Sequence, residues 1–240
     1  MLPINTVIFD VYETLVHNDT ALWIPTFDSI CREQGLNLDG QSLWSQWRPI
    51  ELQFRRYRTV LEDPEQSPPF KSYETAWKET FEQVFTTLGR GDPAAASRRM
   101  IAALQGREPF PETIDVLARL QQSCRFRLGI LSNVDNANLA PLLQTLGIEF
   151  DAVVSSELAQ AYKPHPRAFN RALDALGATP SETIYVGDSQ FDDVQGAKGV
   201  GILSAWVNRY HSDANISLPA PDYEIHNLSE LLEILQVAER

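Results

Sequence analysis

The sequence predicts an α/β protein whose doubly wound parallel sheet carries an all-helical insertion after the first strand. From residue 109 onward, short apolar segments alternate with helical segments of roughly ten residues, as in βαβ units around a parallel sheet. One more apolar segment, Ile4–Phe9, stands alone near the N-terminus. The block from about Thr20 to Leu104 has a helical pattern. A chain of 240 residues fits one large domain, or a core domain with such an insert.

The first element, Ile4–Phe9, ends at Asp10. Because it is nearly all apolar rather than alternating, it predicts a strand that is buried on both faces. In the helical block, apolar side chains recur at steps of three and four, as on one face of a helix. The members of this stripe are Leu43, Trp47, Ile50, Phe54, Tyr57 and Leu61. Pro49 predicts a kink or a first turn there, and a further helix is expected over Tyr73–Leu88.

The later elements alternate in type. Helices are expected over Glu112–Gln122, Asn136–Leu146, Pro166–Leu176, around Asp193–Lys198, and over Leu228–Val237. Strands are expected over Phe126–Leu131, Ala152–Ser155, Thr183–Val186 and Ile202–Val207. Since the first strand belongs to the same sheet, we expect an α/β core formed by residues 1–16 and 109–240, and a helical cap formed by residues 17–108.

The composition excludes several functional classes. With 32 acidic and 20 basic residues, the net charge is −12, which argues against nucleic acid or an anionic membrane as the partner. No apolar run is long enough for a membrane helix, and the N-terminus lacks the basic region of a secretory signal. The two cysteines, Cys31 and Cys124, predict buried inert thiols in a reducing compartment. We therefore expect a cytoplasmic protein that is a monomer or a homodimer.

Polar side chains stand where the predicted strands end. Asp10 follows the first strand, Ser132 and Asn133 follow the second, Lys163 comes after the third, and Asp188 follows the fourth. In open α/β sheets, ligands bind beyond the carboxyl ends of the strands. An acid, a hydroxyl, an amide, a lysine and a second acid are therefore expected to converge at one edge of the sheet.

These segments resemble the motifs of the haloacid dehalogenase-like (HAD) superfamily. The first motif is similar to Ile8-Phe9-Asp10-Val11-Tyr12-Glu13-Thr14-Leu15, the second to Leu131-Ser132-Asn133, the third to Tyr162-Lys163-Pro164, and the fourth to Val186-Gly187-Asp188-Ser189 with Asp192-Asp193. Their order and spacing both fit. The resemblance implies a Rossmann-like core, with a helical cap between the first and second motifs.

The resemblance also implies roles for individual residues. Asp10 would be the nucleophile and would form a covalent aspartyl intermediate. Thr14 and Ser132 would hydrogen-bond the nucleophile or the anionic substrate, with Asn133 beside them, and Lys163 would neutralise developing charge. A Mg²⁺ cofactor would be held by Asp10, Asp188, Asp193 and the backbone carbonyl of Tyr12. Asp192 is the alternative to Asp193.

Two branches of the superfamily compete for this sequence. Tyr12 stands where the phosphatases carry a second Asp, as in the metal-independent 2-haloacid dehalogenases. The Trp47-Arg48 segment resembles the dehalogenase cap, whose Arg meets the substrate's carboxylate or the leaving halide. In the opposite direction, Asp188 has the metal-binding phosphatase form, and Glu13 replaces the Gly of the dehalogenases.

Elementary electrostatics favours the phosphatase branch. Two carboxylates in one pocket without a cation raise the pKa of one of them, and a protonated Asp10 would not attack. The leading interpretation is Mg²⁺-dependent hydrolysis of a small phosphomonoester. The alternatives are a 2-haloacid dehalogenase that uses Tyr12 and Arg48 on the substrate, and a weakly catalytic binding module. His17 is expected at the cap hinge. The alternative is that His17 replaces the missing general acid. Five other arginines are expected on solvated faces: Arg55, Arg56, Arg58, Arg98 and Arg99.

Overall fold

The computed structural model describes residues 4–237; Met1–Pro3, part of the segment interpreted as lacking a signal, and residues 238–240 lie outside the described residues. Six strands form one parallel sheet in the order β3-β2-β1-β4-β5-β6. They are β1 (Thr6–Phe9), β2 (Arg127–Ser132), β3 (Ala152–Ser155), β4 (Thr183–Gly187), β5 (Leu203–Val207) and β6 (Tyr223–Ile225). The predicted fold class is confirmed, and β6 is an additional strand.

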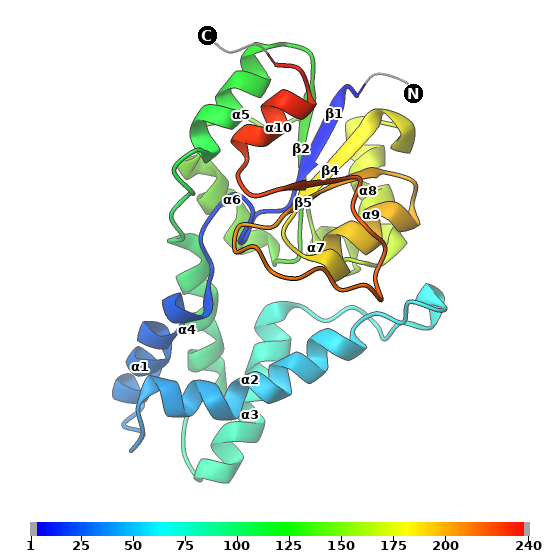
Figure 1. Ribbon diagram of the computed structural model, residues 1–240. Coiled ribbons are helices and arrows are strands. Elements are labelled where there is room, and N and C mark those ends of the chain that lie inside the picture. Colours follow the sequence, from blue (N-terminus) through cyan, green and yellow to red (C-terminus); the bar gives the residue numbers. More distant parts are fainter. Residues whose placement is uncertain (1–3, 238–240) are drawn as a thin grey trace.

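Helices cover both faces of the sheet (Figure 1), because side chains of each buried strand alternate between two apolar layers. Val7 and Phe9 of β1 share one layer with α5 (Thr113–Gln122), α6 (Asn136–Thr145) and α10 (Ser229–Ile234). Ile8 joins the other layer with α8 (Pro166–Leu176) and residues of α9 (Gln195–Gly199). The sheet is therefore buried on both sides, as the apolar runs predict.

Smaller elements complete the core. They are α7 (Ser156–Ala159), the 3₁₀ turn η3 (Pro180–Glu182), and the π-helical turn η4 (Gln190–Val194), which leads directly into α9. Sequence patterns predict one short helix around Asp193–Lys198, whereas the structure has η4 followed by α9. Of the two cysteines, Cys31 is buried and Cys124 is exposed, and both are free, so the expectation of a buried thiol is wrong for Cys124.

The named elements between β1 and α5 are all helices, and they lie beyond the carboxyl ends of the strands (Figure 1). They are η1 (Thr20–Leu22), α1 (Ile24–Glu33), α2 (Gly40–Tyr57), η2 (Pro64–Gln66), α3 (Tyr73–Leu88) and α4 (Pro93–Gln105). We call α1–α4 the cap helices. No helix in residues 4–237 has the length and apolar character needed to cross a membrane.

The entry and exit of this insertion run side by side. Val16 forms an antiparallel bridge with Pro109, and the His17 amide donates to the Glu108 carbonyl at 2.9 Å. The ring of His17 lies 3.9 Å from that of Phe110, measured between centroids. We call this crossing, residues 16–17 and 108–110, the neck. A hinge at the neck and the domain division, residues 1–16 and 109–240 against 17–108, both stay predictions.

The predicted stripe forms the buried face of α2 only in part. Leu43 and Trp47 are buried, but Tyr57 is 66% exposed, and Leu61 lies beyond the end of the helix. Pro49 sits inside α2 rather than at its first turn. The helix ends at Tyr57, with Arg58 as its C-cap residue, which is earlier than the periodicity predicts.

Trp47 is the centre of an aromatic cluster that joins the cap helices. Its ring lies 5.4 Å from that of Phe27 and 5.7 Å from that of Phe81, and its side chain is 2% exposed. We expect Trp47→Ala to lower the free energy of unfolding by about 3–5 kcal/mol, because it leaves a cavity between packed rings. Urea denaturation monitored by circular dichroism measures the loss.

The matched control is Leu52→Ala on the same helix, where the side chain is 45% exposed. This variant should shift stability by no more than about 0.5 kcal/mol. Equal urea midpoints for Trp47→Ala and the unaltered protein would contradict the packing argument.

Candidate active site

A pocket of about 230 Å³ opens at the carboxyl ends of β1, β2 and β4, against the cap helices. The sheet order reverses at β1, since β2 lies on one side of it and β4 on the other. Ligand crevices of α/β proteins occur at this point. Of the predicted site residues, the pocket is lined by Asp10, Tyr12, Ser132, Asn133, Lys163, Asp188 and Asp193.

Lys163 is the electrostatic centre of the site. Its side chain is 2% exposed, and its Nζ donates to Asp10 Oδ1 at 2.7 Å, to Asp193 Oδ1 at 2.6 Å and to the Tyr185 hydroxyl at 2.7 Å. All three ammonium protons are therefore used. The two carboxylates outweigh the cost of burial and raise the pKa of Lys163, so the lysine stays charged.

Asn133 fixes the backbone of Lys163. Its Oδ1 accepts from the Lys163 amide at 2.8 Å, and its Nδ2 donates to the Lys163 carbonyl at 3.2 Å. The amide thus clamps the segment that follows β3 to the end of β2. Asn133 positions the lysine through its backbone, a contact that explains why an amide stands there.

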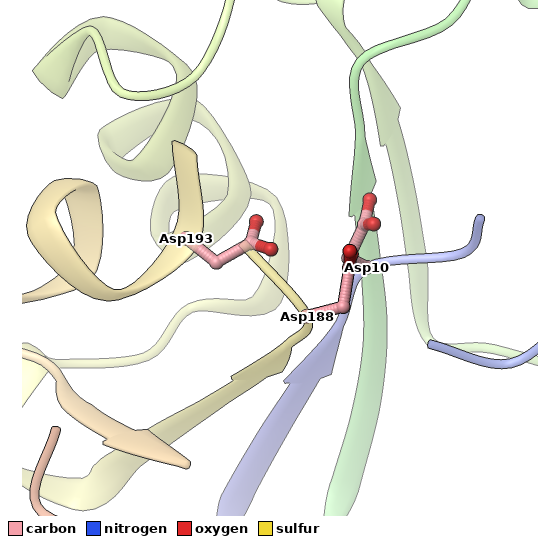
Figure 2. Close-up of side chains that lie close together, drawn as sticks. All are labelled: Asp10, Asp188 and Asp193. Atoms are coloured by element: carbon pink, nitrogen blue, oxygen red, sulfur yellow. The ribbon is translucent and has the colours of Figure 1, made fainter. Parts of the chain in front are cut away.

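Asp10, Asp188 and Asp193 place one carboxylate oxygen each within 4.8 Å of one another (Figure 2). Asp10 comes from the end of β1, Asp188 from the end of β4, and Asp193 from η4. Burial, followed by the charges of Asp193 and Asp10, raises the pKa of Asp188 well above its ordinary value. Burial also raises the pKa of Asp193 to about 6, although Lys163 opposes the rise.

Local contacts hold this triad in place. The Ser189 amide donates to Asp193 Oδ2 at 2.9 Å, and the Trp206 indole donates to the Asp188 carbonyl at 2.7 Å. A Cβ atom at Gly187 would lie 2.4 Å from Asp193 Cγ, so only glycine lets this carboxylate approach the strand end. The sequence Gly187-Asp188 therefore combines a ligand with the space that its neighbour needs.

The triad fits a hard divalent cation. Three carboxylates face one ammonium, so two negative charges remain when all four groups are ionised. Carboxylate oxygens are the ligands that Mg²⁺ prefers. No hydrogen bond to the Asp188 carboxylate occurs within residues 4–237. Asp192, the alternative ligand, is instead engaged by Arg58, which favours Asp193.

Several buried hydroxyls of the first two motifs have no hydrogen-bond partner within the described chain: Tyr12 Oη, Thr14 Oγ1 and Ser132 Oγ. An unpaired buried hydroxyl is costly unless a ligand completes it. Tyr12 and Ser132 also line the pocket. Burial and the Asp10 charge raise the pKa of Tyr12 further above its ordinary value, so its phenol is a weaker acid than in water.

Glu13 has a positive φ of 64°, a conformation that glycine adopts without strain. Its carboxylate accepts hydrogen bonds from the Asn18 amide and from the Tyr210 hydroxyl, the latter at 2.9 Å. Glu13 therefore ties the loop after β1 to the neck of the insertion.

Cap arginines differ from the expected solvated faces. Arg58 is only 8% exposed, donates to Asp192 at 3.0 Å and 3.2 Å, and donates to the Tyr73 hydroxyl at 2.6 Å. The expectation for Arg58 is wrong, because the residue joins the cap to the η4 turn. Arg55 lines the pocket. His17 is not among the lining residues, which argues against its reading as a surrogate acid.

Arg48 lies elsewhere on α2. It is ion-paired with Glu51 and stacks over Trp44 at 5.5 Å, and it is not among the residues that line the pocket. Its predicted substrate contact stays a prediction.

Sequence patterns missed the supporting roles of three residues: Tyr185, Asp135 and Arg58. The Tyr185 hydroxyl accepts from Lys163 and donates to the Leu131 carbonyl at 2.8 Å. Asp135 accepts from the amides of Tyr73 and Glu74 at 2.9 Å and 2.8 Å, so a core carboxylate holds the start of α3. Tyr185 looks like an ordinary aromatic residue of a buried strand, so its sequence gives no sign of its role. The contacts of Asp135 and Arg58 join segments far apart in the chain, which sequence patterns do not reveal.

Comparison with known proteins gives one family and two kinds of relative. The model of the family "haloacid dehalogenase-like hydrolase" matches residues 4–201. (S)-2-haloacid dehalogenase 1 of Pseudomonas sp. (strain CBS-3) is 27% identical over 241 residues, covering 98% of each chain. Phosphoglycolate phosphatase of Salmonella paratyphi A is 34% identical over 136 residues, covering 55% of this chain and 53% of the relative.

Solved structures show the same fold. The HAD-hydrolase YfnB of Bacillus subtilis, bound to magnesium, aligns with a TM-score of 0.79 at 22% identity, covering 98% of this chain and 100% of the other. The L-2-haloacid dehalogenase of Xanthobacter autotrophicus aligns with a TM-score of 0.73 at 23% identity, with the same coverage.

Proposed function

The chain belongs to the haloacid dehalogenase-like hydrolases, and from this premise we propose that it hydrolyses a small phosphomonoester, with Asp10 as covalent nucleophile and Mg²⁺ as cofactor. The observation that carries the proposal is the cluster of Asp10, Asp188 and Asp193, whose oxygens lie within 4.8 Å of one another beside one fully paired lysine. A cation-free site would leave Asp188 protonated or would weaken Asp10.

Asp10 is poised for nucleophilic attack. Lys163 engages its Oδ1, and no hydrogen bond to its Oδ2 occurs within the described residues. In the first step Oδ2 attacks phosphorus, the ester P–O bond breaks and the leaving alkoxide takes a proton from solvent water. In the second step water attacks phosphorus and gives up a proton to solvent, the bond between Asp10 Oδ2 and phosphorus breaks, and inorganic phosphate and the Asp10 carboxylate form.

The buried hydroxyls without a hydrogen-bond partner would contact the substrate or support the nucleophile. Ser132 and Tyr12 line the pocket and would donate to oxygens of the substrate, and Thr14 would support the loop that carries Asp10. Asp10, Asp188, Asp193 and the Tyr12 carbonyl would hold Mg²⁺, which supplies positive charge that offsets the anionic substrate and carboxylates. Tyr12 is too weak an acid to protonate the leaving alcohol efficiently, so the protein should favour good leaving groups.

The second candidate is hydrolysis of a 2-haloacid. Two observations favour it: Tyr12 stands in place of a second Asp, and a relative that matches over 98% of its length is an (S)-2-haloacid dehalogenase. In that reaction Asp10 displaces halide from carbon to form an ester. Water then attacks the carboxyl carbon of Asp10, releasing the 2-hydroxy acid.

A substrate panel separates these candidates. Phosphomonoesters with good and poor leaving groups and 2-haloacids are each tested with Mg²⁺ and with chelator, while released phosphate and halide are measured. We expect Mg²⁺-dependent phosphate release, fastest from p-nitrophenyl phosphate. Chelator-resistant halide release supports the dehalogenase instead, and tight binding without turnover of any substrate supports a binding module.

A further inference from the structure

Glu51 is a fully buried carboxylate on α2 that holds two arginines at once. Its side chain is 0% exposed; Oε2 accepts from Arg48 Nη1 and Oε1 accepts from Arg55 Nε. A buried carboxylate persists only when it is paired in this way. Because Arg55 is one helical turn after Glu51, the ion pair fixes its guanidinium relative to the helix.

Arg55 is held from a second direction by Tyr73, whose ring lies 5.5 Å from its Cζ. Both residues line the pocket, and the Arg55 side chain keeps 39% of its accessible surface. In the described chain, Arg55 forms its hydrogen bond through Nε. Nη1 and Nη2 are therefore left to donate to a ligand as a planar pair.

Lys163 and Arg55 are the cations among the described residues that line the pocket. All three protons of Lys163 are used by Asp10, Asp193 and Tyr185, so Lys163 has none left for a second anionic group of the substrate. Of these two cations, Arg55 is the one whose N–H donors are available to a ligand. Two parallel N–H groups match the two oxygens of a carboxylate.

We propose that Arg55, positioned by Glu51, binds a carboxylate of the substrate and makes the pocket selective for small carboxylated anions. The proposal deepens the proposed function and rests on it, because the reacting group is placed at Asp10. It assigns to Arg55 the contact that the resemblance to the dehalogenase cap implies for Arg48.

The test measures affinity rather than turnover. Phosphoglycolate, ethyl phosphate and 2-chloropropionate are titrated calorimetrically, in the presence of Mg²⁺, into Asp10→Asn and into the same protein carrying Arg55→Gln. We expect Arg55→Gln to weaken both carboxylated ligands about 10- to 100-fold, since a charge-assisted hydrogen-bond pair is lost. Ethyl phosphate, of similar size but without a carboxylate, should weaken far less.

Arg56→Gln is the matched control, because Arg56 is the next residue on α2 and is exposed. It should leave all three affinities as they are. Arg55→Lys keeps the positive charge but lacks the two parallel N–H groups, so it should recover only part of the lost affinity for the carboxylated ligands. Equal weakening of phosphoglycolate and ethyl phosphate would overturn the proposal, since it would indicate general attraction, and so would failure of both carboxylated ligands to bind Asp10→Asn.

The two levels of inference fail separately. Absence of phosphate release by the unaltered protein would defeat the proposed function. Even then, the affinity of 2-chloropropionate for the two variants decides the role of Arg55.

Discussion

Asp10→Asn should lower kcat by roughly 10⁴- to 10⁶-fold, as removal of a covalent nucleophile does elsewhere. The amide is nearly isosteric with the carboxylate but is a poor nucleophile, so the loss should fall on the reaction rather than on folding. Lys163 would still have Asp193 and Tyr185 as partners. Steady-state kinetics and thermal melting on the same samples test both halves of this expectation.

The control is Asp213→Asn, the same chemical change at an exposed position. It should leave kcat unaltered. Single turnover in ¹⁸O-water adds a second readout: the label enters phosphate if water attacks phosphorus, and enters the Asp10 carboxyl if water attacks an ester carbon. Near-normal turnover by Asp10→Asn would remove the covalent mechanism from both candidate reactions.

The core of this site follows from the sequence because it depends on strand ends. Asp10, Ser132 and Asp188 each come directly at or after an apolar run, and parallel strands bring such ends to one edge. Spacing within the chain therefore predicts proximity in space. The same logic places Lys163, although its three partners become visible only in three dimensions.

The cap follows the sequence less closely. The stripe on α2 predicts a helix and its buried face, but not which arginine faces the pocket. Arg48, Arg55 and Arg58 are all compatible with an exposed surface by periodicity alone. Contacts with Glu51, Tyr73 and Asp192 determine where these arginine side chains lie. Asp192 is 134 residues away from Arg58 in the chain. Long-range pairing of this kind leaves no periodic signal.

Mg²⁺ should raise the thermal stability of the protein. A ligand that binds only the native state stabilises it by RT ln(1 + [L]/Kd), about 2.7 kcal/mol at 100 times Kd, which corresponds to a Tm increase of roughly 5–10 °C for a chain of this size. Asp188→Ala should abolish the increase together with phosphatase activity, and chelator should reproduce both effects. Asp213→Ala, at an exposed site, is the control.

The pKa values of the two buried carboxyls predict how stability, and its increase by Mg²⁺, should change with pH. Burial raises the pKa of Asp193 to about 6 and that of Asp188 well above its ordinary value, so the native state holds protons that the unfolded chain, with Asp pKa values of about 4, has already released. Without metal, stability should therefore fall as pH rises from about 4 to about 6. Mg²⁺ competes with these protons, so its stabilising effect should be weak below pH 6 and grow above it. If Mg²⁺ leaves the Tm unchanged at every pH, and if halide release continues in the presence of chelator, the phosphatase proposal is wrong and the 2-haloacid dehalogenase is supported.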